Sequence, residues 1–384
     1  MTIIYIYRSL AVYGGIEKIF VDKINYLAEN FGYDIYMVTY EQGSHPIVYP
    51  LSPKVKHVDL QVPFYKQYRY NLLKRLYINH IMLRRFIFRL KELVASTHAE
   101  IVVGTTCEYT TLYALYNLRH KVKTVIESHT SLFGLKIRVS ISRNVLKKII
   151  YQIEDLKIKY FVKNASMLVC ITRSDAEDWS FVSNISVVMN MLSIYPQTIT
   201  EHTKKEYNVI SVGRLVKQKG YDLLLNIWSL VHERYPEWIL NIYGDGDEKA
   251  NLLKLRENLN LKECVNFCEP TLSIYDKYCE NNFSVMSSRW EGFGLVLVEA
   301  MSCGLPCISF DCPHGPADII KDGENGFLIE KSNLKAFADN IIYLIEHEDV
   351  RKRMGEKARE SVRRYLPENV MPQWKSLFES LINK

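Results

Sequence analysis

Short apolar runs alternate with longer amphipathic segments along most of this chain of 384 residues. The runs are too short for helices and are rich in valine, isoleucine and tyrosine, which favours buried parallel strands. Between them apolar residues recur every three or four positions, as at Phe20, Ile24 and Leu27, which predicts helices packed on a sheet. The expected strands cover residues 3–7, 34–40, 101–105, 124–127, 165–172, 207–213, 239–243, 265–268, 283–286, 306–310 and 325–329. The pattern predicts an α/β protein with doubly wound sheets, in which ligands meet the carboxyl ends of the strands.

The length predicts two domains, because single cores stop growing at about 250–300 residues. The segment 195–205 is polar and contains proline, as expected of a linker. We therefore expect domains at residues 1–198 and 199–365, and a last helix at 366–384. Hydrophobic residues make up 48% of the chain and charged residues 24%, which is typical of an ordered globular protein. The net charge of +6 suits an anionic substrate or membrane headgroups and is too small to indicate nucleic acid as a partner.

One stretch, residues 287–304, carries the strongest chemical signal. It places Glu291 and Glu299 eight positions apart around a glycine turn that ends at Gly294, between an expected strand and an expected helix. Glycines let backbone N–H groups approach an anion, and a helix N-terminus favours negative charge. Glu299 lies about two turns into the helix, so the two carboxylates suit a ligand with sugar-like groups joined by phosphate. The alternative is a plain strand–turn–helix corner with two solvated glutamates.

Other candidate residues follow expected strands. Gly213 ends a strand, and Arg214 and Lys219 come next on the loop before a helix, where such a pair could neutralise a diphosphate. The alternative is a basic surface turn. Further candidates at strand ends or on the loops that follow strands are Gly14, Gly15, His129, Asn190 and Gly244.

The sequence EGFGLVLVEAMSCG, with its Glu-x7-Glu spacing, resembles the signature of the retaining glycosyltransferases of the GT4 group, and Gly-Arg-x4-Lys-Gly at 213–220 is similar to their second motif. The resemblance covers nearly the whole chain but is strong only at 213–326. It implies a GT-B fold, with two Rossmann-like domains facing across a cleft, the first for the acceptor and the second for a nucleotide-sugar. The last helix would cross back to the first domain.

The resemblance also implies roles for the candidates. Glu291 would hold the donor sugar, Glu299 the ribose, and Arg214 and Lys219 the diphosphate, without a metal ion. His129 would touch the donor sugar. The implied donor site is completed by Gly14, Gly15, Asn190, Gly213, Gly244, Phe293, Gly294 and Leu295. This chain departs from the family in having Met191 after Asn190, where proline is usual.

The resemblance favours a UDP-linked hexose or N-acetylhexosamine as donor, and a glycan or lipid-linked glycan in surface polysaccharide synthesis as acceptor. Two alternatives remain open at this point. A nicotinamide-dependent oxidoreductase would need Gly-x-Gly-x-x-Gly after the first strand, which Gly14 and Gly15 do not supply. A non-catalytic sugar-binding homologue would be expected to have lost catalytic residues, whereas Glu291, Glu299, Arg214 and Lys219 are all present.

Residues 64–91 differ from the rest of the chain, because lysines and arginines alternate there with aromatic and aliphatic residues and no acidic residue occurs. The composition indicates either peripheral contact with an anionic membrane or a core helix with a solvated basic face. No spanning segment is visible, and the eight cysteines are expected to be reduced structural thiols rather than zinc ligands. We therefore expect a cytoplasmic location, at or near the inner face of the membrane.

Overall fold

The computed structural model describes residues 1–140, 144–197 and 207–383, which form two compact units. The first unit comprises Met1–Met191 and Glu368–Lys384, and the second comprises Leu192–Pro367. The domain boundary expected between residues 198 and 199 lies outside the described residues. Within the described ranges, no helix combines the length and the apolar character needed to cross a membrane.

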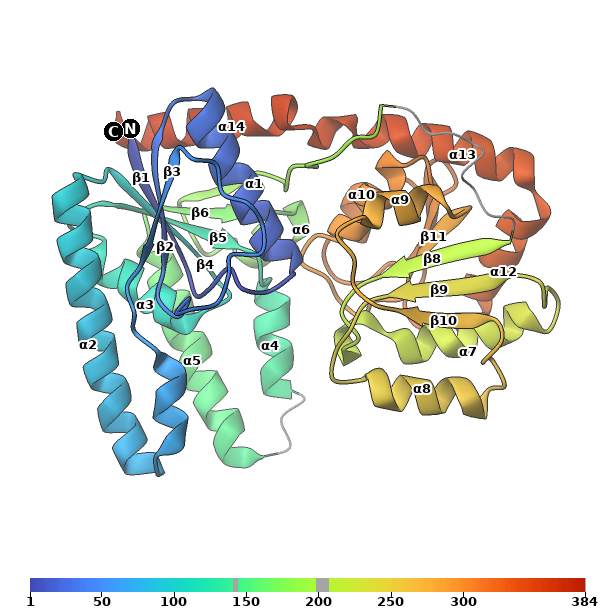
Figure 1. Cartoon of the computed structure of the whole chain (residues 1–384), viewed down its shortest axis with the longest axis horizontal. Helices are drawn as coiled ribbons and strands as arrows, with labels where there is room; N and C mark the ends of the chain where they lie inside the picture. Colours follow the sequence, from blue (N-terminus) through green and yellow to red (C-terminus); the bar gives the residue numbers. More distant parts are fainter. Residues whose placement is uncertain (141–143, 198–206, 384) are drawn as a thin grey trace. The chain divides into compact units, whose positions relative to one another are not determined.

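The first unit is built on a seven-stranded parallel sheet with the order β3-β2-β1-β4-β5-β6-β7. Its central strands are buried by helices on both faces, which explains why they read as continuous apolar runs, whereas the edge strands β3 and β7 are partly exposed (Figure 1). Their bounds are β1 (Thr2–Tyr7), β2 (Asp34–Thr39), β3 (Val55–Asp59), β4 (Ile101–Thr105), β5 (Lys123–Ser128), β6 (Met167–Cys170) and β7 (Ile185–Val187).

Alternate residues of β1 enter two different cores, because successive side chains of a strand point to opposite faces. Ile4 and Ile6 join the core beneath α2, α3 and α5, whereas Ile3 and Tyr5 join the core beneath α1 and α14. The helices of this unit are α1 (Gly15–Asn30), η1 (Phe64–Arg69), α2 (Leu72–Thr97), α3 (Tyr109–Leu118), α4 (Leu132–Ser140), α5 (Val145–Lys163), α6 (Arg173–Asp178) and α14 (Pro367–Ile382).

Helix α14 belongs to the first unit although the chain reaches it only after the second. Its apolar stripe, which includes Trp374, Leu377 and Leu381, is buried in the same core as β1 and α1. The last helix that we expected from the sequence at residues 366–384 corresponds to α14.

The second unit contains a six-stranded parallel sheet with the order β10-β9-β8-β11-β12-β13. Its strands are β8 (Asn208–Val212), β9 (Ile239–Tyr243), β10 (Val265–Cys268), β11 (Phe283–Met286), β12 (Cys307–Phe310) and β13 (Gly326–Ile329). Its helices are η3 (Lys217–Lys219), α7 (Tyr221–His232), α8 (Lys249–Asn258), α9 (Ile274–Cys279), α10 (Leu295–Ser302), α11 (Pro316–Ile319), α12 (Leu334–Glu346), α13 (Glu348–Ser361) and η4 (Val362–Tyr365).

In each sheet the strand order reverses once, between β1 and β4 in the first unit and between β8 and β11 in the second. The chain leaves two neighbouring strands at this point in opposite directions, so their following loops separate and leave room for a ligand. In the second unit these loops begin at Gly213 and Ser287, and both contain residues singled out in the sequence.

Candidate functional site

The loops that follow β8 and β11 are fastened to each other. The backbone N–H of Arg289 donates to the carbonyl of Gln218 at 2.7 Å, and Gln218 Nε2 donates to the carbonyl of Trp290 at 2.9 Å. Ser287 Oγ donates to the carbonyls of Lys219 and Gly220 at 3.1 and 3.0 Å. These bonds fix the relative positions of the side chains that the two loops carry.

Gly220 allows this close approach. A Cβ atom at this position would lie 2.2 Å from the carbonyl oxygen of Ser287, and the φ angle of +66° is in the left-handed region that glycine tolerates best. Any other residue would push the loops apart, so the glycine that follows Lys219 is a packing requirement of the site.

Lys219 and Glu291 meet at the centre of this arrangement. Lys219 Nζ lies 2.6 Å from Glu291 Oε1, and Ser288 Oγ donates to the same oxygen. The side chains are 16% and 6% exposed. Because little water screens the pair, both charges act strongly on each other and on any charged ligand beside them. The structure thus joins two of the expected catalytic residues directly.

A second ion pair, between Arg289 and Asp222, stabilises the loop that follows β11. Arg289 donates to both carboxylate oxygens of Asp222 on α7, at 2.8 and 2.7 Å, and also to the carbonyl of Lys217. Partial burial would raise the pKa of Asp222, but the Arg289 guanidinium outweighs it and holds that pKa below its usual value. This bidentate pair orients the loop that carries Glu291.

Helix α10 begins next to this pair. Gly294 precedes it with a φ of +86° and provides no side-chain cap, so the first N–H groups of the helix, starting at Leu295, have no capping partner from that residue. Phe293 is buried against Tyr365, with ring centroids 5.5 Å apart, which anchors the turn. A helix N-terminus of this kind favours an anion.

Glu299 occupies a different part of the site from Glu291. It is buried in the second turn of α10, and Tyr278 Oη lies 3.5 Å from its Oε2. Burial raises the pKa of Tyr278, and the nearby Glu299 carboxylate raises it further. Tyr278 therefore stays protonated and can donate to Glu299, which fixes where that carboxylate points.

The remaining expected residues of the second unit line the loop after β8. Arg214 is exposed. A Cβ atom on Gly213 would lie 3.4 Å from Lys219 Cε, and one on Gly244 would lie 2.0 Å from the carbonyl oxygen of Gly213. Gly244 therefore serves close backbone packing between the loops after β8 and β9. In the part of the chain that the structure describes, no cluster of three or more His, Cys, Asp or Glu residues could hold a metal ion.

The other four expected residues belong to the first unit. Gly14 precedes α1, which begins at Gly15 directly after the loop from β1. Asn190 is buried near the end of the unit. His129 follows β5, and its imidazole is buried, with Nε2 2.9 Å from Glu127 Oε2.

Glu127 also accepts from Lys23 on α1, whose Nζ lies 4.2 Å from the centre of the Trp374 ring. Burial would raise the pKa of Glu127, but Lys23 and His129 outweigh it and hold that pKa below its usual value. His129 is thus held by a buried charged network that links α1, β5 and α14.

Several of these contacts were not predicted from the sequence. Lys23 stands within the apolar stripe of α1, next to Ile24 and three positions after Phe20, and a lysine in such a stripe signals a buried partner. The Arg289–Asp222 pair carries no comparable signal because its two members lie on distant segments, and the contact of Ser288 with Glu291 depends on the backbone conformation of their loop.

Comparison with known proteins agrees with this architecture. The family model described as glycosyl transferases group 1 matches residues 197–361. An uncharacterized glycosyltransferase of Haemophilus influenzae is 28% identical over 370 residues, covering 95% of this chain and 96% of that protein. The poly(ribitol-phosphate) alpha-N-acetylglucosaminyltransferase of Staphylococcus aureus is 32% identical over 230 residues, 58% of this chain, and the match spans only 46% of that relative's length.

The crystal structure of S. aureus TarM superposes with a TM-score of 0.80 at 17% identity, covering 98% of this chain and 99% of that one. At this identity the likeness shows the fold alone, which is GT-B. The expected α/β class with two parallel-sheet domains is confirmed, and the oxidoreductase and non-catalytic alternatives are set aside. These findings support a GT4-type glycosyltransferase, in which residues 197–361 belong to the glycosyl transferases group 1 family.

Proposed function

We propose that this enzyme transfers a hexose or N-acetylhexosamine from a UDP-linked donor to a hydroxyl of a glycan or lipid-linked glycan, with retention of the anomeric configuration. The observation that carries the proposal is the Lys219–Glu291 pair, held at the point where the strand order reverses and next to the start of α10. This arrangement offers a cation, a carboxylate and a helix N-terminus to one ligand, as a sugar diphosphate requires.

The chemistry follows from where charge develops. The bond between the anomeric carbon and the diphosphate oxygen breaks, and the diphosphate keeps the electron pair. Lys219, Arg214 and the N–H groups at Gly294 and Leu295 stabilise the charge that appears on the leaving oxygen. These groups supply the positive charge that a metal ion provides in other transferases, so the proposed mechanism needs no metal.

Glu291 holds the hydroxyls of the donor sugar in this mechanism. The acceptor hydroxyl attacks the same face of the anomeric carbon that the diphosphate leaves, and its proton passes to the departing phosphate. The carboxylate of Glu299, fixed by Tyr278, takes the ribose hydroxyls. For His129, Asn190 and the Gly14–Gly15 turn of the first unit, we keep the donor-binding roles that the resemblance to the GT4 group implies.

The choice of UDP and of a glycan acceptor is supported by similar proteins. The TarM structure contains UDP and alpha-GlcNAc-glycerol, and the S. aureus relative is named as an N-acetylglucosaminyltransferase acting on poly(ribitol-phosphate). We extend the donor to this chain and place the enzyme in surface polysaccharide synthesis. Residues 64–91 would bring it to an anionic cytoplasmic membrane surface where a lipid-linked acceptor is found.

Thermal denaturation with UDP, GDP, ADP, dTDP and NAD tests the donor base. Selective stabilisation by UDP is the expected result, because a ligand that binds only the folded state raises its melting temperature. A rise in melting temperature with GDP or ADP alone would mean that the donor carries guanine or adenine instead of uracil. If no diphosphate stabilises the protein and no UDP-sugar is hydrolysed, the proposal is wrong.

A further inference from the structure

The N-terminal half of α2 and the preceding η1 expose an unusual number of large apolar side chains. Leu73 is 81% exposed, and the exposed set also includes Tyr65, Tyr68, Tyr70, Leu76, Tyr77 and Ile81. The side chains of α2 that contact the core begin at Met82, and Phe86 and Leu90 are fully buried there. Figure 1 shows why: the N-terminal end of α2 projects beyond the edge of the sheet, so it has no core to join.

Helix α5 repeats this arrangement. Its first half extends past the sheet on the same side of the unit in Figure 1, and α3 packs against both α2 and α5. Its exposed apolar side chains are Val145, Ile149, Ile150, Ile153, Leu156 and Tyr160, of which Leu156 is 68% exposed. From the sequence alone, we did not connect residues 145–160 with residues 64–81. We refer to the exposed apolar residues of η1, α2 and α5 together as the projecting surface.

The charged residues of the projecting surface are mainly basic. No acidic residue occurs between Leu60 and Lys91, whereas Lys66, Arg69, Lys74, Arg84 and Arg85 are exposed there. In α5 the first acidic residue is Glu154, and exposed Lys147 and Lys148 precede it.

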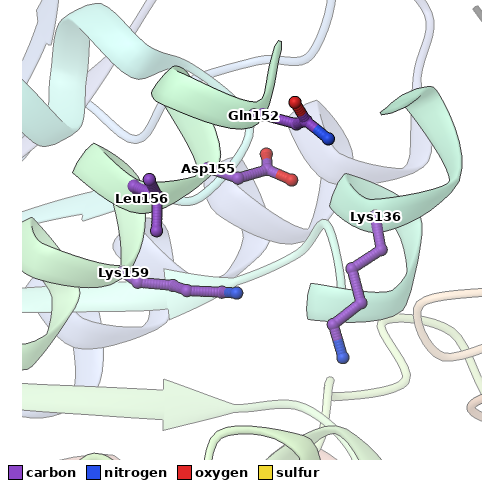
Figure 2. A pocket seen from close by; sticks show the side chains of 5 residues that line it. All are labelled: Lys136, Gln152, Asp155, Leu156 and Lys159. Carbon is purple, nitrogen blue, oxygen red and sulfur yellow. The ribbon is translucent and has the colours of Figure 1, made fainter. Parts of the chain in front are cut away.

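A hollow of about 420 Å³ between α4 and α5 adds two more lysines beside Leu156. Figure 2 shows the side chains of Lys136 and Lys159 extending towards it, with Asp155 and Gln152 on its wall.

The basic and aromatic side chains are paired on the surface itself. Lys74 Nζ lies 4.5 Å from the centre of the Tyr70 ring, and the Arg75 guanidinium lies 4.1 Å from that of Tyr68. Tyrosines next to lysines and arginines suit the boundary between headgroups and acyl chains, where one end of each side chain is apolar and the other polar.

We propose that the projecting surface docks on an anionic lipid bilayer, with α2 and α5 as two separate points of insertion. The apolar side chains enter the headgroup boundary, and the basic residues contact lipid phosphates. A core helix with a solvated basic face would bury its large apolar side chains, whereas Leu73, Leu76, Ile149 and Ile150 are exposed. The inference rests on the proposed function in one respect, since it places the enzyme where a lipid-linked acceptor resides.

Sedimentation of the full chain with vesicles tests the proposal. We expect binding to vesicles of phosphatidylcholine with phosphatidylglycerol, weak binding to phosphatidylcholine alone, and a decline with added salt. Leu73→Glu and Ile149→Glu, one on each helix, should each weaken binding about tenfold or more. Lys74→Gln and Lys147→Gln should each weaken it about fivefold. Leu230→Glu, at an exposed leucine of α7, is the matched control and should bind as the unchanged protein does.

The outcomes separate this proposal from the proposed function. Absence of vesicle binding, or equal loss in Leu73→Glu and Leu230→Glu, overturns the lipid surface while stabilisation by UDP still supports the transferase. If Leu73→Glu weakens vesicle binding and Ile149→Glu does not, the role of α5 as a point of insertion is overturned. Self-association without lipid that Leu73→Glu abolishes, together with no vesicle binding, would assign the surface to a second copy of the chain.

Discussion

Replacing Glu291 with glutamine tests the centre of the candidate site with the smallest change in shape. The substitution keeps an oxygen where Oε1 accepts from Lys219 and Ser288, but it removes the negative charge that faces the Lys219 ammonium. Lys219 is only 16% exposed, so water replaces the lost partner poorly.

The effect on stability follows from this geometry. Breaking a fully buried ion pair costs about 3–5 kcal/mol. Here the neutral amide still accepts a hydrogen bond and Lys219 keeps some contact with water, so we expect about 2 kcal/mol. For a unit of this size that corresponds to a decrease of about 4–8 °C in the melting temperature.

The effect on catalysis should be separable from stability. Loss of a charged hydrogen bond to the donor sugar costs about 1.5–3 kcal/mol, so we expect kcat to fall about 10- to 100-fold. Binding of UDP should change less than about threefold, because the proposal assigns the diphosphate to Lys219, Arg214 and the start of α10. The measurements are donor hydrolysis, calorimetric titration with UDP and thermal unfolding followed by circular dichroism.

Glu257→Gln, at an exposed glutamate on α8, controls for the general effect of removing a negative charge and should leave all three quantities unchanged. A folded Glu291→Gln protein with kcat within about threefold of the unchanged enzyme would refute the role of Glu291. Equal losses in UDP affinity and kcat would show that Glu291 acts on the nucleotide rather than on the sugar.

Three further substitutions test neighbouring features. Arg214→Gln should weaken UDP binding about tenfold in calorimetric titration and change the unfolding free energy by less than about 0.5 kcal/mol, because Arg214 is exposed; unchanged affinity would remove it from the site. Gly294→Ala should destabilise the second unit by about 1–2 kcal/mol in chemical denaturation; the cause is the backbone φ of +86°, since the nearest contact of the added Cβ atom, at 3.4 Å, is ordinary. Gly15→Ala, with open space around the added Cβ atom, is the control. Equal destabilisation in both variants would contradict the argument from backbone strain. The pKa of Glu127 lies below its usual value in the folded protein, so its stabilising contribution to the unfolding free energy is present above the unfolded pKa of about 4.5 and is lost as the pH falls through the folded pKa. The unfolding free energy of Glu127→Gln should therefore depend less on pH below about 4.5 than that of the unchanged protein. Parallel curves of unfolding free energy against pH for the two proteins would contradict this.

The sequence predicted the strands well because burial on both faces leaves a clear mark. Residues 3–7 and 283–286 were expected as strands and form β1 and β11, and both sheets are parallel as the doubly wound pattern predicts. The turns that carry Lys219 and Glu291 were expected because glycines after an apolar run mark a strand end, whereas the roles of these two residues came from the resemblance to the GT4 group and stay predictions.

The partners of these residues were harder to predict. Ser288 and Glu291 are close in sequence, but only the backbone conformation of the loop turns the serine hydroxyl towards the carboxylate. The Arg289–Asp222 pair joins positions 67 residues apart, and charge alone does not select one partner among many. The projecting surface was half predicted: residues 64–91 stood out by composition, whereas the exposure of α5 depends on how far its first turns extend past the sheet.

The two units share a strand order but differ in the charges at the point where it reverses. In the first unit, Arg8 follows β1, and its guanidinium lies 2.6 Å from Glu41 and 3.9 Å from Glu108. In the second, Arg214 and Lys219 follow β8, and Glu291 is the carboxylate bound to Lys219. A diphosphate brought to the first point would meet two carboxylates for one cation, whereas the second presents two cations, one carboxylate and the start of α10. Because both sheets reverse their strand order in the same way, these loop residues favour the second unit as the place for the proposed diphosphate.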